Sequence, residues 1–172
     1  MKTQTRSFTL IEILIVISIV ALLTGLSLAS YNNFTQQKNL EREAHKLSDV
    51  LSLAKIKAQT GDVAINITCS PPDFEFGGYM VTVNAMEYNF SQCCREVVSK
   101  TIASCGPQIQ NYDLPANIAA SFLSGSSPVY FYPLASGASE STIRLKNTTV
   151  NKCVNLSVTS IGVISIGDVS AC

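Results

Sequence analysis

The sequence predicts an α+β fold in which one long amino-terminal helix precedes an antiparallel β-sheet that packs on the helix's second half. Three observations predict it. An apolar run covers residues 8–29, a single apolar stripe with helical spacing follows from Leu40 to Ala58, and beyond Gly61 the apolar period changes to two. With 172 residues, the chain has room for this helix and one modest globular domain, so no second domain is needed.

The apolar run follows the basic residues Lys2 and Arg6, and Glu12 is its only formal charge. A run of about twenty apolar residues is long enough to span a bilayer, and the basic start places the amino end in the cytoplasm. A cleavable secretory signal has the same basic start and apolar core. This run, however, is longer than an ordinary signal core and continues into an amphipathic helix without a breaker. A plain membrane anchor leaves Glu12 unexplained, because a carboxylate in a membrane normally has a partner.

The second part of the predicted helix is amphipathic. Gly61 is its expected end, and one continuous helix over residues 8–60 would be about 80 Å long. The opposite face carries charges that we interpret as a solvated surface. The apolar stripe consists of Leu40, Ala44, Leu47, Leu51, Ala54 and Ala58, and the opposite face carries Glu41, Arg42, Lys46, Lys55 and Lys57.

Alternating apolar residues, bounded by segments rich in Gly, Ser, Pro and Asn, predict the strands. A final hairpin is expected over residues 157–166, with Gly162 near its turn. Residues 89–113 contain three cysteines and show no clear period, so we expect a cross-linked surface excursion there. The other predicted strands lie at 63–67, 79–84, 128–132, 142–145 and 154–158.

The charge balance argues against general nucleic-acid binding. The formal net charge is zero, and without Lys2 and Arg6 ten basic side chains stand against twelve acidic ones. Nucleic-acid binding needs a concentrated basic surface, which this composition does not supply.

Six cysteines lie beyond the apolar run, and an even number in an exported domain predicts disulfides. Six cysteines allow fifteen pairings, and among these the sequence favours Cys153 with Cys172. No pair has C-x-x-C spacing and His45 is the only histidine, so no metal site and no cofactor are expected. The six are Cys69, Cys93, Cys94, Cys105, Cys153 and Cys172.

Hydrolase motifs are missing from the sequence. It contains neither a Gly-x-Ser-x-Gly elbow nor a His-Glu-x-x-His helix, and His45 is the only histidine that could act as a base. Asp73 and Glu75 follow Pro71-Pro72 in a predicted loop, where carboxylates are usually solvated. We therefore expect a protein that is not an enzyme.

The start of the apolar run carries a family resemblance. Ser7-Phe8-Thr9-Leu10-Ile11-Glu12 resembles the cleavage and methylation motif of type IV prepilins and type II secretion pseudopilins, usually Gly-Phe-Thr-Leu-(Ile/Leu/Val)-Glu, with Ser7 in the place of Gly. The resemblance implies cutting between Ser7 and Phe8 by a prepilin peptidase, which also N-methylates Phe8. It further implies that Glu12 pairs with the free amine of a neighbouring subunit's Phe8 during assembly.

The resemblance also implies how the chain is divided. Residues 1–7 would be the leader and residues 8–30 the membrane-spanning or filament-core half of the helix. Residues 31–172, including the distal helix 31–60, would form a periplasmic or extracellular pilin domain of a type IV pilin-like fold. The implied location is the inner membrane at first, and afterwards a helical filament with other pilins or pseudopilins.

A second resemblance covers the body of the chain. The stripe from Ala44 to Ala58, the segment 129–137 and the closing segment 156–163 are similar to the H-type minor pseudopilins and FimT/FimU-type minor pilins. This implies a low-copy subunit at or near a filament tip, of either a type II secretion pseudopilus or a type IV pilus. The alternative is a tip receptor for adhesion or DNA uptake. Some relatives bind DNA through an arginine after the hairpin glycine, where this chain has Val163 and Ile164.

Overall fold

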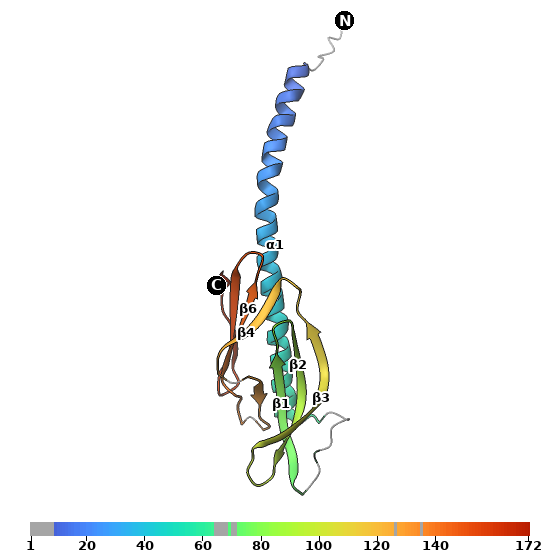
Figure 1. The fold of residues 1–172 in the computed structure, drawn as a ribbon, viewed down its shortest axis with the longest axis vertical. Helices are drawn as coiled ribbons and strands as arrows, with labels where there is room; N and C mark the ends of the chain where they lie inside the picture. Colours follow the sequence, from blue (N-terminus) through green and yellow to red (C-terminus); the bar gives the residue numbers. More distant parts are fainter. Residues whose placement is uncertain (1–8, 64–68, 70–71, 126, 135) are drawn as a thin grey trace, which may run out of the picture. The chain divides into compact units, whose positions relative to one another are not determined.

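The computed structural model describes residues 9–63, 69, 72–125, 127–134 and 136–172, and for residues 25–30 it describes the backbone alone. The chain divides into two compact units, Met1–Gln36 and Gln37–Cys172, and each is described by itself (Figure 1). The helix α1 (Leu10–Thr60) contributes to both units. All the strands lie in the second unit.

The end of α1 is fixed by a glycine, as its sequence predicts. Gly61 has a φ of +66°, a left-handed conformation that glycine adopts without steric cost. The N–H of Gly61 donates to the carbonyl of Ala58 (3.4 Å) and that of Asp62 to the carbonyl of Lys57 (3.1 Å). These two bonds form a Schellman motif, which satisfies carbonyls that the last helical turn would leave free.

The strands form two antiparallel sheets rather than the one that the sequence predicts. The first has the order β3-β2-β1-β5, and the second has the order β4-β6-β7-β8, with β9 also paired to β7. Alternation in a sequence identifies strands but not their neighbours, so it could not separate one sheet from two. The bounds are β1 (Phe74–Val83), β2 (Glu87–Glu96), β3 (Ile102–Asp113), β4 (Ile118–Gly125), β5 (Val129–Phe131), β6 (Ser141–Asn147), β7 (Lys152–Val158), β8 (Ile164–Ile166) and β9 (Ser170–Ala171).

The core of the second unit combines the apolar stripe of α1 with the inner faces of both sheets. All six residues of the predicted stripe are buried, and Val50 joins them. The first sheet adds aromatic side chains, and the second adds branched aliphatic ones. The largest are Tyr79, Tyr88, Phe90 and Phe131 from the first sheet, and Ile118, Ile143, Leu145 and Leu156 from the second.

The prediction for residues 89–113 is confirmed in one part and wrong in the other. The segment is cross-linked, as expected, by the disulfide Cys93–Cys105. It is not an irregular excursion, because it forms most of β2 and β3, which pair with each other along their lengths. The apolar alternation of Tyr88 and Phe90 stops at Gln92, which faces the same side yet is fully buried. Sequence reasoning also missed β4. Of the predicted strand 63–67, residues 64–68 lie outside the described residues.

The closing hairpin agrees with its prediction. β7 pairs with β8 through Leu156 opposite Ile166 and Val158 opposite Ile164. Gly162 lies in the connection with a φ of +76°, and its N–H donates to the carbonyl of Thr159 (2.8 Å).

Candidate assembly site

Glu12 lies in the first turn of α1, where the backbone of Thr9 starts the helix. The carbonyl oxygen of Thr9 accepts hydrogen bonds from the backbone N–H groups of Glu12 (3.1 Å) and Ile13 (3.3 Å). The Oγ1 of the Thr9 side chain accepts a longer bond from the same N–H of Glu12 (3.4 Å). Thr9 therefore acts as the N-cap. A carboxylate in a first helical turn is also favoured by the helix dipole, so Glu12 has a local role besides any role between subunits.

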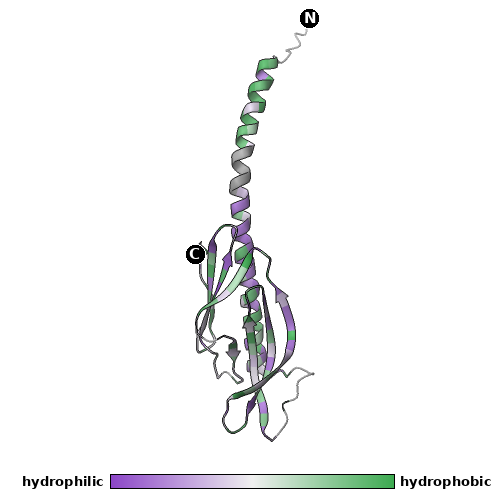
Figure 2. Ribbon diagram, viewed as in Figure 1, coloured by the Kyte–Doolittle hydropathy of each residue, from purple (hydrophilic) through white to green (hydrophobic). Residues whose placement is uncertain are grey.

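Apolar surface surrounds Glu12 on all sides of the helix. Leu10 is 82% exposed and Ile15 is 51% exposed, and the other large apolar residues from Ile11 to Leu23 lie between these values. Figure 2 shows this part of α1 mainly in the green of hydrophobic residues. An apolar surface of this extent normally belongs to an interface with protein or lipid.

The hydroxyl groups within this surface are satisfied by the helix itself. The Oγ of Ser18 donates to the carbonyl of Leu14 (2.8 Å), and the Oγ1 of Thr24 donates to the carbonyl of Val20. Neither side chain therefore needs water as a partner, which suits an apolar environment. In the part of the chain that the structure describes, no helix meets the length and apolar content that crossing a membrane requires.

Ser7 and Phe8, the expected cleavage and methylation positions, lie outside the described residues. Thr9 and Glu12 are the described members of the motif. The structure therefore brings together the helix cap, the acid and the apolar surface of the predicted site.

The six cysteines form three disulfides: Cys69–Cys94, Cys93–Cys105 and Cys153–Cys172. The last is the pair that the sequence favours. The adjacent Cys93 and Cys94 point to opposite faces of β2, because successive side chains alternate along a strand. Cys93 joins β2 to β3 through Cys105, and Cys94 joins β2 to the segment after α1 through Cys69. This arrangement could not be deduced from spacing because it depends on strand order.

The titratable residues singled out in the sequence do not assemble into a reactive centre. His45 is exposed on α1, and Glu75 is held in ion pairs by the Nε of Arg95 and the Nζ of Lys100, each at 2.7 Å. Among the described residues, no cluster of three or more His, Cys, Asp or Glu side chains has a geometry that could hold a metal ion. The turn before β8 exposes Ile161 and Val163 rather than cationic groups.

Sequence reasoning missed a buried acid and a groove beside it. Glu43 is 2% exposed and accepts from the Nζ of Lys46 (2.8 Å). Its position, three residues after Leu40 and four before Leu47, is the signal that could have revealed its burial. Burial, followed by the nearby charge of Glu43, raises the pKa of Tyr88 to about 12, so the phenol stays neutral.

The groove lies between α1 and the ends of β2 and β3. The rings of Tyr88 and Tyr112 stack along it, with their centroids 5.2 Å apart and their planes at 12°. Its walls therefore combine aromatic and aliphatic side chains with one acid and one base. The lining residues are Lys46, Asp49, Val50, Leu53, Tyr88 and Tyr112.

Comparison with known proteins first concerns the opening segment of this chain. Residues 2–28 match the family model described as the prokaryotic N-terminal methylation motif, which confirms the resemblance of the opening segment to prepilins. The helix packed on antiparallel sheets gives this chain a type IV pilin-like fold, which the structural comparison below supports.

The particular similarity is to the minor pseudopilin EpsH from the type 2 secretion system of Vibrio cholerae. The two structures align with a TM-score of 0.50 and 11% sequence identity, over 75% of this chain and 96% of EpsH. At this identity the likeness concerns the fold, and it agrees with the predicted resemblance to H-type minor pseudopilins. No curated protein sequence matches the chain.

Proposed function

We propose that this chain is a structural, non-enzymatic and low-copy subunit of a type II secretion pseudopilus or a type IV pilus. The observation that carries the proposal is the methylation motif over residues 2–28 at the head of a chain with a pilin-like fold. Supporting it, Glu12 lies at the start of a helix whose surface around it is apolar.

In this proposal the leader 1–7 is removed between Ser7 and Phe8, and Phe8 becomes N-methylated. Residues 8–30 hold the subunit in the inner membrane and later pack in the filament core, while residues 31–172 remain on the periplasmic or extracellular side. The membrane step rests on the sequence of residues 8–29. The expected partners are the prepilin peptidase and other pilins or pseudopilins.

Glu12 would then select and align the incoming subunit. Cutting creates a cationic amine on Phe8, and the apolar surroundings of Glu12 weaken the screening that water would provide. Breaking an ion pair in such a place leaves an uncompensated charge, at a cost of several kcal/mol. A neutral residue at position 12 should therefore impair assembly far more than it impairs insertion.

The test is Glu12→Gln in the native host, compared with Glu41→Gln, which neutralises a second acid of the same helix. Glu41 pairs with Lys38 within its own helix (2.6 Å), so its loss should leave assembly unchanged. We expect the E12Q chain to remain in the membrane fraction and to fall at least about tenfold in sheared or cross-linked filaments. Equal incorporation of E12Q and E41Q would contradict the proposed role of Glu12.

A further inference from the structure

The strand β3 forms an open edge of the first sheet. It pairs with β2 on one side, and within the described part of the chain no strand pairs with its other side. Its side chains are exposed from Pro107 to Asn111 and again at Asp113. An edge strand presents a row of backbone N–H and C=O groups that another strand can match.

The pairing register shows which of these groups are directed outward. The N–H of Leu114 donates to the carbonyl of Met86 (2.8 Å), which makes these two a hydrogen-bonded pair. Hydrogen-bonded and non-hydrogen-bonded pairs alternate in an antiparallel ladder. Tyr112, opposite Tyr88, therefore bonds inward, whereas the backbone groups of Asn111 and Asp113 point away from β2.

Along most of its length the edge lacks the charges that commonly protect such strands, and Asp113 at its end is the only charged residue of β3. The segment 101–112 contains no Lys, Arg, Asp or Glu. Pro107 and irregular pairing interrupt its first half, whereas pairing is regular from Gln110 to Asp113. Inward or flanking charges, proline and bulges are the usual protection against strand addition. The stretch from Gln110 to Tyr112 has none of these within it.

The groove lies beside this same part of the edge, since Tyr112 belongs to both. A strand added next to β3 would direct alternate side chains to the face that carries the groove. Val50, Leu53 and the two tyrosine rings would contact an apolar or aromatic side chain there. Lys46 and Asp49 carry opposite charges, so the groove does not favour a partner side chain of either charge.

We propose that residues 110–113 of β3 bind an extended, uncharged segment of another polypeptide as an additional antiparallel strand. Backbone bonds to Asn111 and Asp113 supply affinity, and an aromatic or branched side chain of the partner fills the groove. Recognition of this kind joins main-chain pairing to side-chain pockets.

The partner strand belongs to a different protein rather than to a second copy. Antiparallel pairing of two β3 strands would relate the two copies by a two-fold axis. The two copies would then point in opposite directions. In Figure 1, β3 is roughly aligned with the axis of the carboxyl-terminal part of α1 and its arrow points the opposite way. Reversing one β3 strand would therefore also reverse this part of one helix relative to the other. Subunits of one filament point the same way, a step that rests on the proposed function.

The test uses the full chain in detergent micelles and a fluorescent probe peptide, acetyl-Thr-Val-Thr-Tyr-Thr-Val-Thr-amide. A peptide with Lys in place of its Tyr is the control probe. Asn111→Pro removes the outward N–H without touching an inward ladder bond, and Asn111→Ala removes the same side chain but keeps the N–H. We expect N111P to weaken binding about tenfold and N111A to change it less than about twofold.

Two further readouts separate binding from folding defects. The peptide should slow hydrogen exchange of the Asn111 and Asp113 amides in the unmodified chain, while the already bonded Tyr112 amide changes little. Leu53→Glu should weaken the Tyr peptide and remove its advantage over the Lys peptide. Equal binding of N111P and N111A would overturn the proposal, as would absence of amide protection. Dimers of the chain that N111P abolishes would also overturn it, since the partner would then be a second copy.

Discussion

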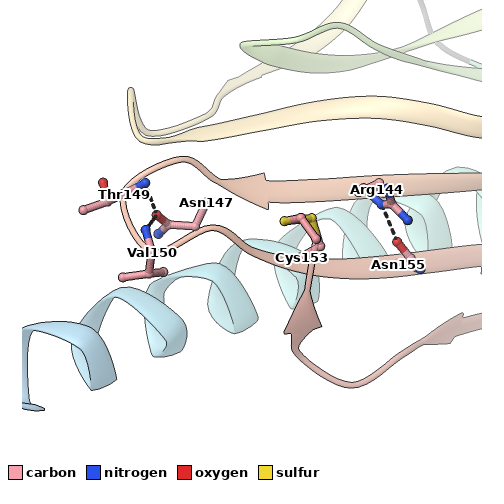
Figure 3. The surroundings of a disulfide bond; sticks show 7 residues. Arg144, Asn147, Thr149, Val150, Cys153 and Asn155 are labelled. Carbon is pink, nitrogen blue, oxygen red and sulfur yellow. Dashed lines mark hydrogen bonds between the residues drawn. A yellow bond between two sulfur atoms is a disulfide. The ribbon is translucent and has the colours of Figure 1, made fainter.

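Asn147 shows how a single buried amide can shape a turn. It is fully buried at the end of β6, and its Oδ1 accepts from the backbone N–H groups of Thr149 (2.9 Å) and Val150 (3.3 Å), as Figure 3 shows. These bonds hold the connection from β6 to β7. Nearby, Asn155 accepts from the Nε of Arg144 (3.1 Å) at an exposed position.

This contrast gives the first residue-scale prediction. Asn147→Ala should lower the free energy of unfolding by about 1–3 kcal/mol, because two backbone donors lose a buried acceptor. Asn155→Ala should cost less than about 0.5 kcal/mol, because Asn155 is itself exposed to water. Chemical denaturation of both variants measures the difference. Equal costs would show that the turn does not depend on the Asn147 amide.

Glu75 gives a prediction about pH. Hydrogen bonds from Lys100 and then Arg95 lower the pKa of its carboxyl in the folded chain. A lowered folded-state pKa contributes stability that is present above the ordinary carboxyl value, near pH 4 to 5, and is lost as pH falls through the folded value. The melting temperature of Glu75→Gln should therefore fall less steeply below about pH 5 than that of the unmodified chain.

Lys100→Gln provides the complementary variant, since it removes one of the two donors and keeps the acid. It should reproduce part of the flattening seen with E75Q. If the acid limb of the melting curve is identical in all three chains, these ion pairs do not contribute to the pH dependence.

At the scale of elements, the burial of apolar side chains differs between the two ends of α1. Residues 10–23 are apolar nearly all round and exposed, whereas residues 40–58 bury one stripe against their own domain. The stripe predicts a clear difference between two leucines. Leu47→Ala should cost about 2–5 kcal/mol, because Leu47 is fully buried and its loss leaves a cavity.

Leu53→Ala is the matched control, because Leu53 is 36% exposed and belongs to the groove. Its cost should stay below about 1.5 kcal/mol. The comparison needs only equilibrium denaturation of the two variants. A similar cost for both would mean that residues 40–58 do not pack as the stripe requires.

Sequence periodicity predicted the elements whose neighbours are local. The stripe of α1, its end at Gly61 and the β7–β8 hairpin each depend on residues close together in the chain. β2 and β3 were missed because Gln92 faces the core and the two cysteines hide the alternation. The candidate functional residues also differ in whether the sequence alone could identify them. Glu12 stands out as a charge in an apolar run, whereas the β3 edge and its groove depend on long-range strand order.

At the scale of the whole molecule, the two units differ in whether their apolar side chains are buried within the unit or exposed. The unit 37–172 has a core of its own, fixed by the two sheets and three disulfides. The unit 1–36 exposes large apolar side chains from Leu10 to Leu23, a surface of the kind that belongs to an interface. This division suits a subunit whose globular unit has its own core and whose apolar helix is covered in an assembly. It also explains why the motif at residues 2–28 carries more of the functional argument than the domain does.

The measurement that tests this account most directly is the mass and amino-terminal sequence of the mature chain, purified from its native membrane. The account predicts a chain that begins at Phe8, carries one additional methyl group on its α-amine and retains the apolar segment. A mature chain that keeps Met1 to Ser7, or that begins beyond Ala29, would contradict it.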